Sequence, residues 1–258
     1  MALSSSVDNV LRLVKERTGL PVHVEPDPTL PPHLLSKVTM ARGAMPIHRV
    51  AYQPNASEAP DYLIIYECGF ILRAYALPPE ARCDLGSTEV AETTVRRWVI
   101  DNPKRPGLPP DKADRLTSIL FNGILTQLRS IPVGLRVDSW IRSEFPDLAG
   151  LQEKAMTRQL NDCAGALRPD VQASMPDGAL TINIAMSTAY SLYWAETLAR
   201  PQIALPFRAT GHLESGRALL DIWRRIPDDP ANDRELTDAW AARLGLSDWY
   251  FWAKQSAD

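Results

Sequence analysis

The sequence of 258 residues is poor in cysteine and histidine, which supply most transition-metal ligands and many nucleophile–base pairs in proteins. The three cysteines, Cys68, Cys83 and Cys163, include no Cys-x-x-Cys pair. An odd and sparse set of this kind argues against a disulfide scaffold and against a cysteine-rich zinc site. It predicts reduced thiols, as in a cytoplasmic protein.

Signals for membranes and nucleic acids are also missing. No apolar run approaches the roughly 18 residues that are needed to cross a bilayer. Residues 1–20 lack a basic region ahead of an apolar run, so they are not expected to be a secretory signal; Val7, Val10 and Val14 instead predict an amphipathic helix. The formal net charge is −3, whereas a nucleic-acid-binding protein usually carries a basic face. We therefore expect a cytoplasmic protein without a membrane segment and without a strong nucleic-acid signal.

Proline is abundant, with 22 residues, and it divides the chain into many short elements. In the N-terminal part, the alternation of apolar residues predicts one strand at 20–26 and two strands within 36–54. Pro46 makes one of these two an edge strand or interrupts it. A helix is expected from about residue 58 or 61 to 75, with Ser57 as its N-cap. A second helix is expected at 87–100.

The remainder of the chain is predicted to be almost entirely helical. The segment 101–112, DNPKRPGLPPDK, is rich in proline and charge and marks the best domain boundary. We expect an α/β unit at 1–103 and a helical region at 112–258, or one continuous domain. Apolar periodicity predicts these helices: 116–128, a short one at 137–145, 147–167, a central buried one at 179–199, 212–226, 233–245 and 246–255. The predicted fold class is α+β, a small N-terminal β-sheet followed by a mainly helical array.

One stretch, DYLIIYECGFILRAY at 61–75, carries the motif with most chemical content. With histidine in place of Tyr66 and Phe70, residues 66–70 become His-Glu-Cys-Gly-His. In a helical zinc peptidase, two histidines four residues apart bind the metal from one helix face. The glutamate after the first histidine polarises the metal-bound water, and Glu67 occupies that position.

The order of elements over residues 20–76, a strand and loop leading into an apolar helix with this motif, resembles the zincin metallopeptidases of the ImmA/IrrE-like kind. Members of that family carry His-Glu-Leu-Gly-His at this point. The resemblance implies a zincin-like fold and a bacterial cytoplasmic setting, often in mobile-element or phage-related regulation. A zinc site would also need a third ligand, for which Glu89 and Glu92 are candidates by sequence distance. The helical remainder is not covered by the resemblance.

The chain departs from this family at both ligand positions. Phe70 cannot bind zinc, and Tyr66 would first have to lose a proton whose pKa is about 10. Glu67 is retained, but its catalytic task disappears without a metal-bound water. The histidines are scattered and do not restore the site: His23, His33, His48 and His212. We therefore expect an inactive metallopeptidase-like protein without metal or cofactor, which acts as a protein-binding or structural subunit with a protein partner or as a homo-oligomer.

Two alternatives remain open. The first is a hydrolase that uses Glu67 and Cys68, if a histidine of the N-terminal segment (His23, His33 or His48) folds against the thiol. A small buried hydrophobe is the commoner role of such a cysteine. The second alternative is a structural helical protein unrelated to zincins. Glu67 favours a former site, because an unpaired carboxylate in an apolar helix is costly and must line a cavity or pair with a cation. The candidate cations are Arg42, Arg49 and Arg73.

Four consecutive aromatic residues stand near the C-terminus, from Trp249 through Tyr250 to Trp252. In a helix they cannot all face one core, because successive residues are about 100° apart. Some of them must meet another surface, either of this chain or of a partner, since aromatic side chains are enriched in interface cores. Trp249, Tyr250 and Trp252 are therefore candidate interface residues.

Overall fold

The computed structural model describes residues 3–31, 34–54 and 60–255 of an α+β protein, as the sequence predicted. Its contacts divide the chain into two compact units. The first unit comprises Met1–Asp84, Arg136–Gln159 and Lys254–Asp258, and the second comprises Leu85–Leu135 and Leu160–Ala253. The proline-rich segment 101–112 therefore lies inside the second unit. The sequence analysis expected a domain boundary at this segment, whereas the division into units falls elsewhere.

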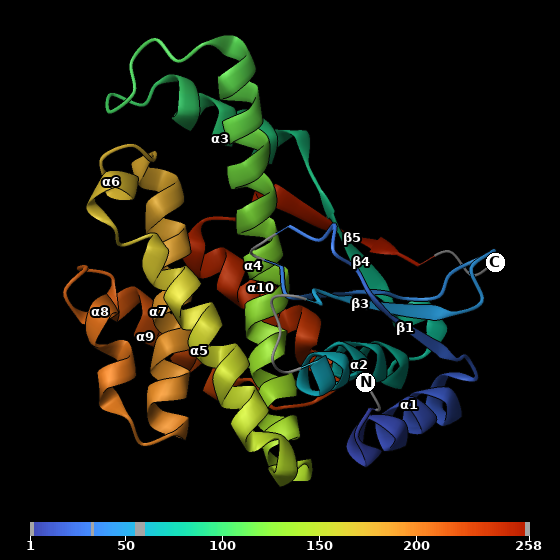
Figure 1. Ribbon diagram of the computed structural model, residues 1–258. Helices are drawn as coiled ribbons and strands as arrows, with labels where there is room; N and C mark the ends of the chain where they lie inside the picture. The colour runs from blue at the N-terminus through green and yellow to red at the C-terminus, as the bar shows by residue number, and fades with distance from the viewer. Residues whose placement is uncertain (1–2, 32–33, 55–59, 256–258) are drawn as a thin grey trace. The chain divides into compact units, whose positions relative to one another are not determined.

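The first unit is built on a three-stranded sheet (Figure 1). The strand order is β1-β3-β2, with β1 parallel to β3 and β2 antiparallel to it. In register, Val22 lies opposite His48 and Ser36 lies opposite Tyr52. The elements are α1 (Ser5–Thr18), β1 (Val22–Pro26), β2 (Ser36–Thr39), β3 (His48–Tyr52), α2 (Pro60–Ala76), a 3-10 turn η1 (Pro79–Ala81), and parts of two later helices. The predicted strands and helices of this region are confirmed, while Ser57 lies outside the described residues.

The core of this unit forms where α1 and the sheet pack on α2. Val7, Val10 and Val14 repeat on one face of α1 and are buried, as their spacing predicted. Helix α2 is apolar around most of its circumference and has nine buried residues. At Gly69 it approaches the C-terminal half of α4 so closely that an added Cβ would lie 2.5 Å from Val137 Cγ1. Packing alone thus requires the glycine of the motif.

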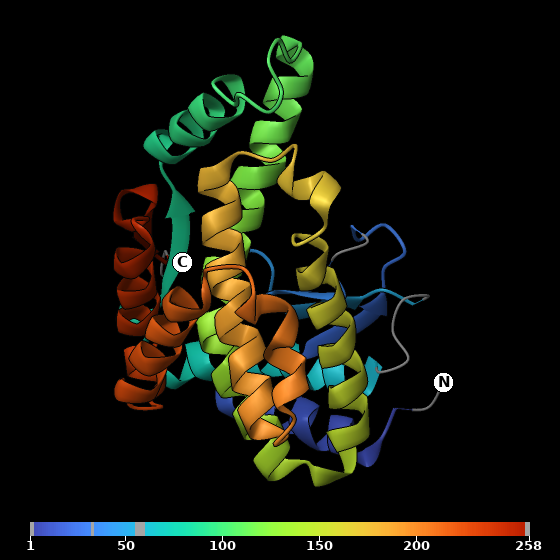
Figure 2. The ribbon, with the colours of Figure 1, turned by 90° about the vertical axis from the view of Figure 1, so that its left-hand side faces the viewer.

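The second unit is mainly helical and centres on α7, which is buried almost continuously from Ile184 to Ala195. Helix α9 lies beside α7 in both views (Figures 1 and 2), and Gly216 allows close approach to Thr188 and Ala189. Its α-helices include α3 (Glu89–Ile100), the first part of α4 (Pro110–Glu144), α6 (Pro169–Gln172), α7 (Asp177–Thr197), α8 (Leu205–Arg208), α9 (Leu213–Arg225) and α10 (Asp233–Leu244). Helix α5 (Ala149–Gly165) belongs partly to each unit. Every helix of the described residues is too short or too polar to span a membrane.

Two predicted helices are wrong. Residues 137–145 are not a separate short helix, because α4 continues from Pro110 to Glu144 with Pro132 inside it. The proline is accommodated among the buried residues Leu128, Ile131 and Leu135, whose burial outweighs one lost backbone hydrogen bond. Residues 246–255 are not helical either. They form a 3-10 turn, η5 (Ser247–Trp249), and a strand, β5 (Tyr250–Lys254), that pairs with β4 (Cys83–Ser87), which the sequence analysis missed.

Candidate functional site

Helix α2 presents a row of three aromatic rings along one face. Tyr66 and Phe70, the predicted former ligand positions, contact each other edge to face with centroids 5.3 Å apart. The Tyr62 ring continues the row one turn earlier, 5.8 Å from that of Tyr66. Tyr66 and Phe70 are partly buried and pack against the core of the first unit. The four-residue spacing thus brings both side chains to one face of the helix.

The two ring positions are not suited to hold zinc. Burial raises the pKa of the Tyr66 phenol well above its ordinary value, and the carboxyl groups of Asp138 and Glu67 raise it further. The phenol therefore stays protonated and is a poor metal ligand. Phe70 has no donor atom. In the part of the chain that the structure describes, no group of three or more histidine, cysteine, aspartate or glutamate residues is placed to bind a metal. The residues present therefore do not fit a zinc ion.

Glu67 is buried, with 7% of its surface exposed, so its side chain does not point into bulk solvent. Its Oε1 accepts a hydrogen bond of 2.7 Å from Ser36 Oγ. Ser36 is the first residue of β2, and its position is fixed by its pairing with Tyr52 of the neighbouring strand. The carboxylate that would activate water in a zincin is here part of a buried contact between helix and sheet.

Two of the three arginines proposed as partners of Glu67 are engaged or placed elsewhere. Arg42 forms an ion pair with Asp84. Arg49 lies on β3 with an exposed side chain. Arg73 is half-buried in the last turn of α2. The partner that the structure places on Glu67 Oε1 is a neutral hydroxyl, which the sequence analysis did not anticipate.

Sequence reasoning missed Asp138, which lies on the C-terminal half of α4 and is 1% exposed. Tyr62 Oη donates a 2.7 Å hydrogen bond to its Oδ1. Gln152 Nε2 donates to the same Oδ1 at 3.1 Å and to the Asp138 carbonyl at 2.9 Å. Burial raises the pKa of Asp138 to about 7, although these two side-chain hydrogen bonds lower it in part. The sequence feature that could have identified Asp138 is its position as a single aspartate near the apolar residues Val137 and Ile141.

The candidates for a third ligand are elsewhere. Glu89 and Glu92 lie on α3 in the second unit, and both side chains are exposed. Asp138, in contrast, belongs to the same unit as Tyr66 and is close enough to raise its pKa. The acidic side chain near the aromatic row thus lies 76 positions after Tyr62 in the chain, so sequence distance was a poor guide.

Cys68 is fully buried and has the surroundings of an inert thiol. Burial raises its pKa to about 12, and the charge of Glu67 adds to the shift. His48 is also fully buried, but its Nδ1 accepts a hydrogen bond from the Ala41 backbone N–H at 3.1 Å. Burial lowers the pKa of His48 to about 4, so the ring is neutral. Among the described residues, no histidine forms a hydrogen bond with Cys68, and His33 lies outside them.

The C-terminal aromatic residues pack within the second unit. Trp249 is buried against the ring of Trp98 at 5.4 Å. Tyr250 Oη and Trp252 Nε1 donate hydrogen bonds of 2.6 and 2.8 Å to Asp238 Oδ1. The strand alternates its side chains, so Phe251 turns to the other side and remains 52% exposed. The three candidate interface residues are therefore engaged in intramolecular contacts.

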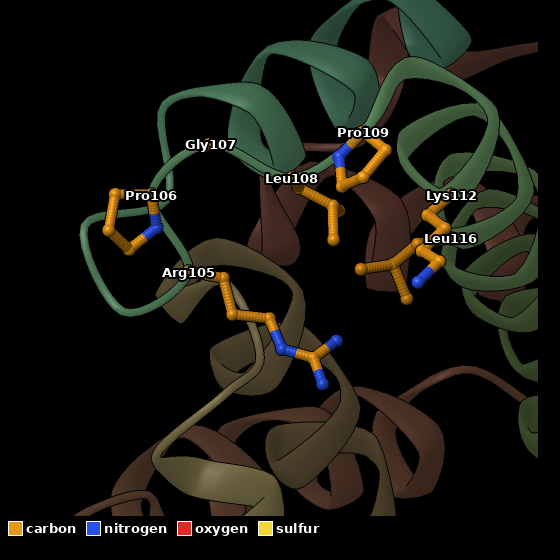
Figure 3. A pocket seen from close by; sticks show the side chains of 7 residues that line it. All are labelled: Arg105, Pro106, Gly107, Leu108, Pro109, Lys112 and Leu116. Atoms are coloured by element: carbon orange, nitrogen blue, oxygen red, sulfur yellow. The ribbon is translucent and has the colours of Figure 1, made fainter.

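A shallow cavity of about 330 Å³ lies in the second unit (Figure 3). None of the residues that line it belongs to the motif of α2. It is formed by the proline-rich segment and the start of α4. None of its lining residues is a candidate of the sequence analysis.

No protein-family model, no curated protein and no solved structure matches the chain significantly. The site must therefore be interpreted from its own geometry.

Proposed function

We propose that the first unit is a catalytically inactive relative of the zincin metallopeptidases, and that the chain acts as a protein-binding or structural subunit. The observation that carries this proposal is the contact between Tyr66 and Phe70. Two aromatic rings, one helical turn apart, stand where the motif would place two imidazoles. A bacterial cytoplasmic setting, in an assembly or a regulatory system, follows from the family resemblance and belongs to the same proposal.

The arrangement around α2 supports a zincin ancestry. Strand β3 comes directly before α2 in the order of elements, and α2 packs on β2 and β3. Glu67 follows Tyr66, as the water-activating glutamate follows the first histidine of the zincin motif. An ordinary core helix would have little reason to keep a carboxylate among so many apolar residues. In this chain the hydroxyl of Ser36 on β2 accommodates it.

The same geometry supports the absence of metal-dependent hydrolysis. Tyr66 stays protonated because of burial and two nearby carboxyl groups, and Phe70 offers no donor atom. Glu67 is tied to Ser36 and is largely shielded from solvent. A general base must reach the proton that it abstracts, and burial limits the access of substrate to this carboxylate.

A hydrolase that uses Glu67 and Cys68 is less well supported. A nucleophilic cysteine needs a lowered pKa and access to substrate, whereas Cys68 is fully buried with a pKa of about 12. A structural helical protein unrelated to zincins remains the other competitor. Restoring the lost ligands distinguishes the two ancestries, and that experiment is described in the Discussion.

Four measurements on the wild-type protein test the proposal. Elemental analysis after dialysis against a weak chelator is expected to find far less than one zinc per chain. A peptidase assay is expected to find no cleavage of unfolded protein substrates. Light scattering coupled to size exclusion, together with affinity purification against a tag-only control, is expected to find a homo-oligomer or one stoichiometric partner. One tightly held zinc per chain, or a monomer with peptidase activity and no partner, would contradict the proposal.

A further inference from the structure

The part of the proline-rich segment that precedes α4, the loop of residues 101–109, is held in place by two of its side chains. Asn102 Nδ2 donates a 2.9 Å hydrogen bond to the Ser174 carbonyl, and Asn102 is 5% exposed. Lys104 Nζ donates to the Gln172 carbonyl at 2.8 Å and to Asp177 Oδ1 at 2.5 Å. Proline also fixes the backbone φ angle at several positions of this segment. The loop is therefore largely pre-formed.

This loop and the first turns of α4 line the shallow, open cavity of about 330 Å³ (Figure 3). Leu108 and Leu116 provide apolar lining, and Lys112 and Leu116 share one face of α4 because they are four residues apart. In Figure 3 the Arg105 side chain extends from the loop, and Lys112 extends from the helix, toward the same open space.

The charges at the cavity are not compensated by the protein. Lys104 is engaged with Asp177, but within residues 60–255 neither Arg105 nor Lys112 forms an ion pair. No lining residue is acidic. Two cations beside an apolar surface favour a ligand that combines a negative charge with a short apolar body.

We propose that this cavity binds a small organic anion, a carboxylate or a phosphate ester with a compact apolar group. Its volume lies at the lower end of the range for small-molecule sites, about 300–1,000 Å³, so the ligand must be small. Because the loop is anchored through Asn102 and Lys104, binding requires little ordering of the backbone, which reduces its entropic cost. The proposal concerns the second unit and goes beyond the function proposed for the first.

Chemical-shift mapping by NMR on the isotope-labelled full chain tests the proposal, with benzoate and phenyl phosphate as anionic probes. Benzamide serves as the neutral probe of similar shape, and inorganic phosphate serves as the anion without an apolar group. Saturable shifts are expected at the amides of residues 105, 107, 108, 112 and 116 with at least one organic anion. Benzamide and inorganic phosphate are expected to bind at least about tenfold more weakly, since each lacks one of the two favourable interactions.

Arg105→Gln and Lys112→Gln are each expected to weaken binding of the organic anion by about tenfold. Arg115→Gln is the matched control, because Arg115 is an exposed cation of the same helix that does not line the cavity. Unchanged spectra elsewhere show that the variants fold. The absence of saturable shifts with both organic anions would overturn the proposal. Equal binding of benzamide, or equal effects of the Arg115 control and the two cavity variants, would overturn it as well.

Discussion

Replacing the buried aspartate, Asp138→Asn, is expected to stabilise the protein at neutral and alkaline pH. The pKa of Asp138 is raised from 3.8 to about 7, with burial as the main cause. One pKa unit corresponds to about 1.4 kcal/mol, so ionisation of this group lowers the free energy of unfolding by about 4 kcal/mol. Asparagine keeps an oxygen that accepts hydrogen bonds from Tyr62 and Gln152 but carries no charge.

The sign follows from the two protonation states. Because the folded-state pKa is higher than the unfolded-state pKa, the folded chain retains a proton that the unfolded chain releases between pH about 4 and 7. The contribution of Asp138 to stability is greatest below this window and is lost as pH rises through the folded pKa. The wild-type protein should therefore gain stability relative to Asp138→Asn when the pH falls from 8 toward 4.

Urea unfolding of both proteins at pH values across this window measures the difference. Asp162→Asn is the matched control, because Asp162 is an exposed aspartate of α5. Hydrogen exchange of the α2 amides locates the change in the first unit, which matters because two units need not unfold together. The variant is expected to be more stable than the wild type at pH 8, by up to about 4 kcal/mol, with the advantage shrinking toward pH 4.

A constant difference between the two proteins across this pH range would refute the reasoning. So would an Asp138→Asn variant that is less stable than the wild type at pH 8. Either result would mean that the ionised carboxylate is stabilised in the folded state more than its burial and its two hydrogen bonds account for.

Three further outcomes are expected. Gly69→Ala should lower the free energy of unfolding by about 1–3 kcal/mol, because the added methyl group clashes with Val137. Thermal melts should show that Val137→Ala, added to this variant, recovers part of the loss. If the losses of the two substitutions simply add, the close approach of Gly69 and Val137 is contradicted. Cys68 should resist a thiol reagent at pH 8 in the native protein and react only after unfolding. If peptide mapping instead finds that Cys68 is labelled rapidly in the native protein, the thiol is accessible and the expectation is wrong. Tyr66→His combined with Phe70→His should make the melting temperature rise saturably with zinc at pH 8, and a folded double variant without this response would contradict a surviving third ligand.

Asp138 is our candidate for that third ligand, since it raises the pKa of Tyr66 and belongs to the same unit. In a triple variant that also carries Asp138→Asn, the zinc response should disappear, because the neutral amide is a weaker zinc ligand than a carboxylate. If the triple variant responds as strongly as the double variant, another side chain supplies the ligand. A wild-type response of equal strength would show that Tyr66 and Phe70 do not block the position.

Local patterns in the sequence determined most helices and the small sheet. The valines of α1 repeat at helical spacing, and their burial follows from that repeat alone. Alternating residues and prolines defined β1, β2 and β3, and Pro78 ended the prediction for α2 close to its observed end at Ala76. The four-residue spacing placed Tyr66 and Phe70 on one face, because that relation is a property of any α-helix.

Tertiary structure decided the elements whose stability depends on distant partners. Helix α4 runs through Pro132 because the surrounding apolar side chains are buried, and local propensity cannot reveal that burial. Residues 250–254 form a strand because β4 supplies hydrogen bonds from far away in the sequence. A helical pattern and a strand are hard to distinguish in a short apolar run without knowledge of such a partner.

The chemistry of the candidate site also depended on the fold. The motif in α2 identified Glu67, but only the packing of β2 against α2 showed that Ser36 is its hydrogen-bond partner. Asp138 became part of the site because the C-terminal half of α4 packs against α2, with the Val137 side chain close to Gly69 and Asp138 bonded to Tyr62. Burial then set the pKa values of Tyr66 and Asp138, since desolvation disfavours the charged form of each. The sequence determines which groups can ionise, whereas the tertiary structure determines their solvation and thereby their charge.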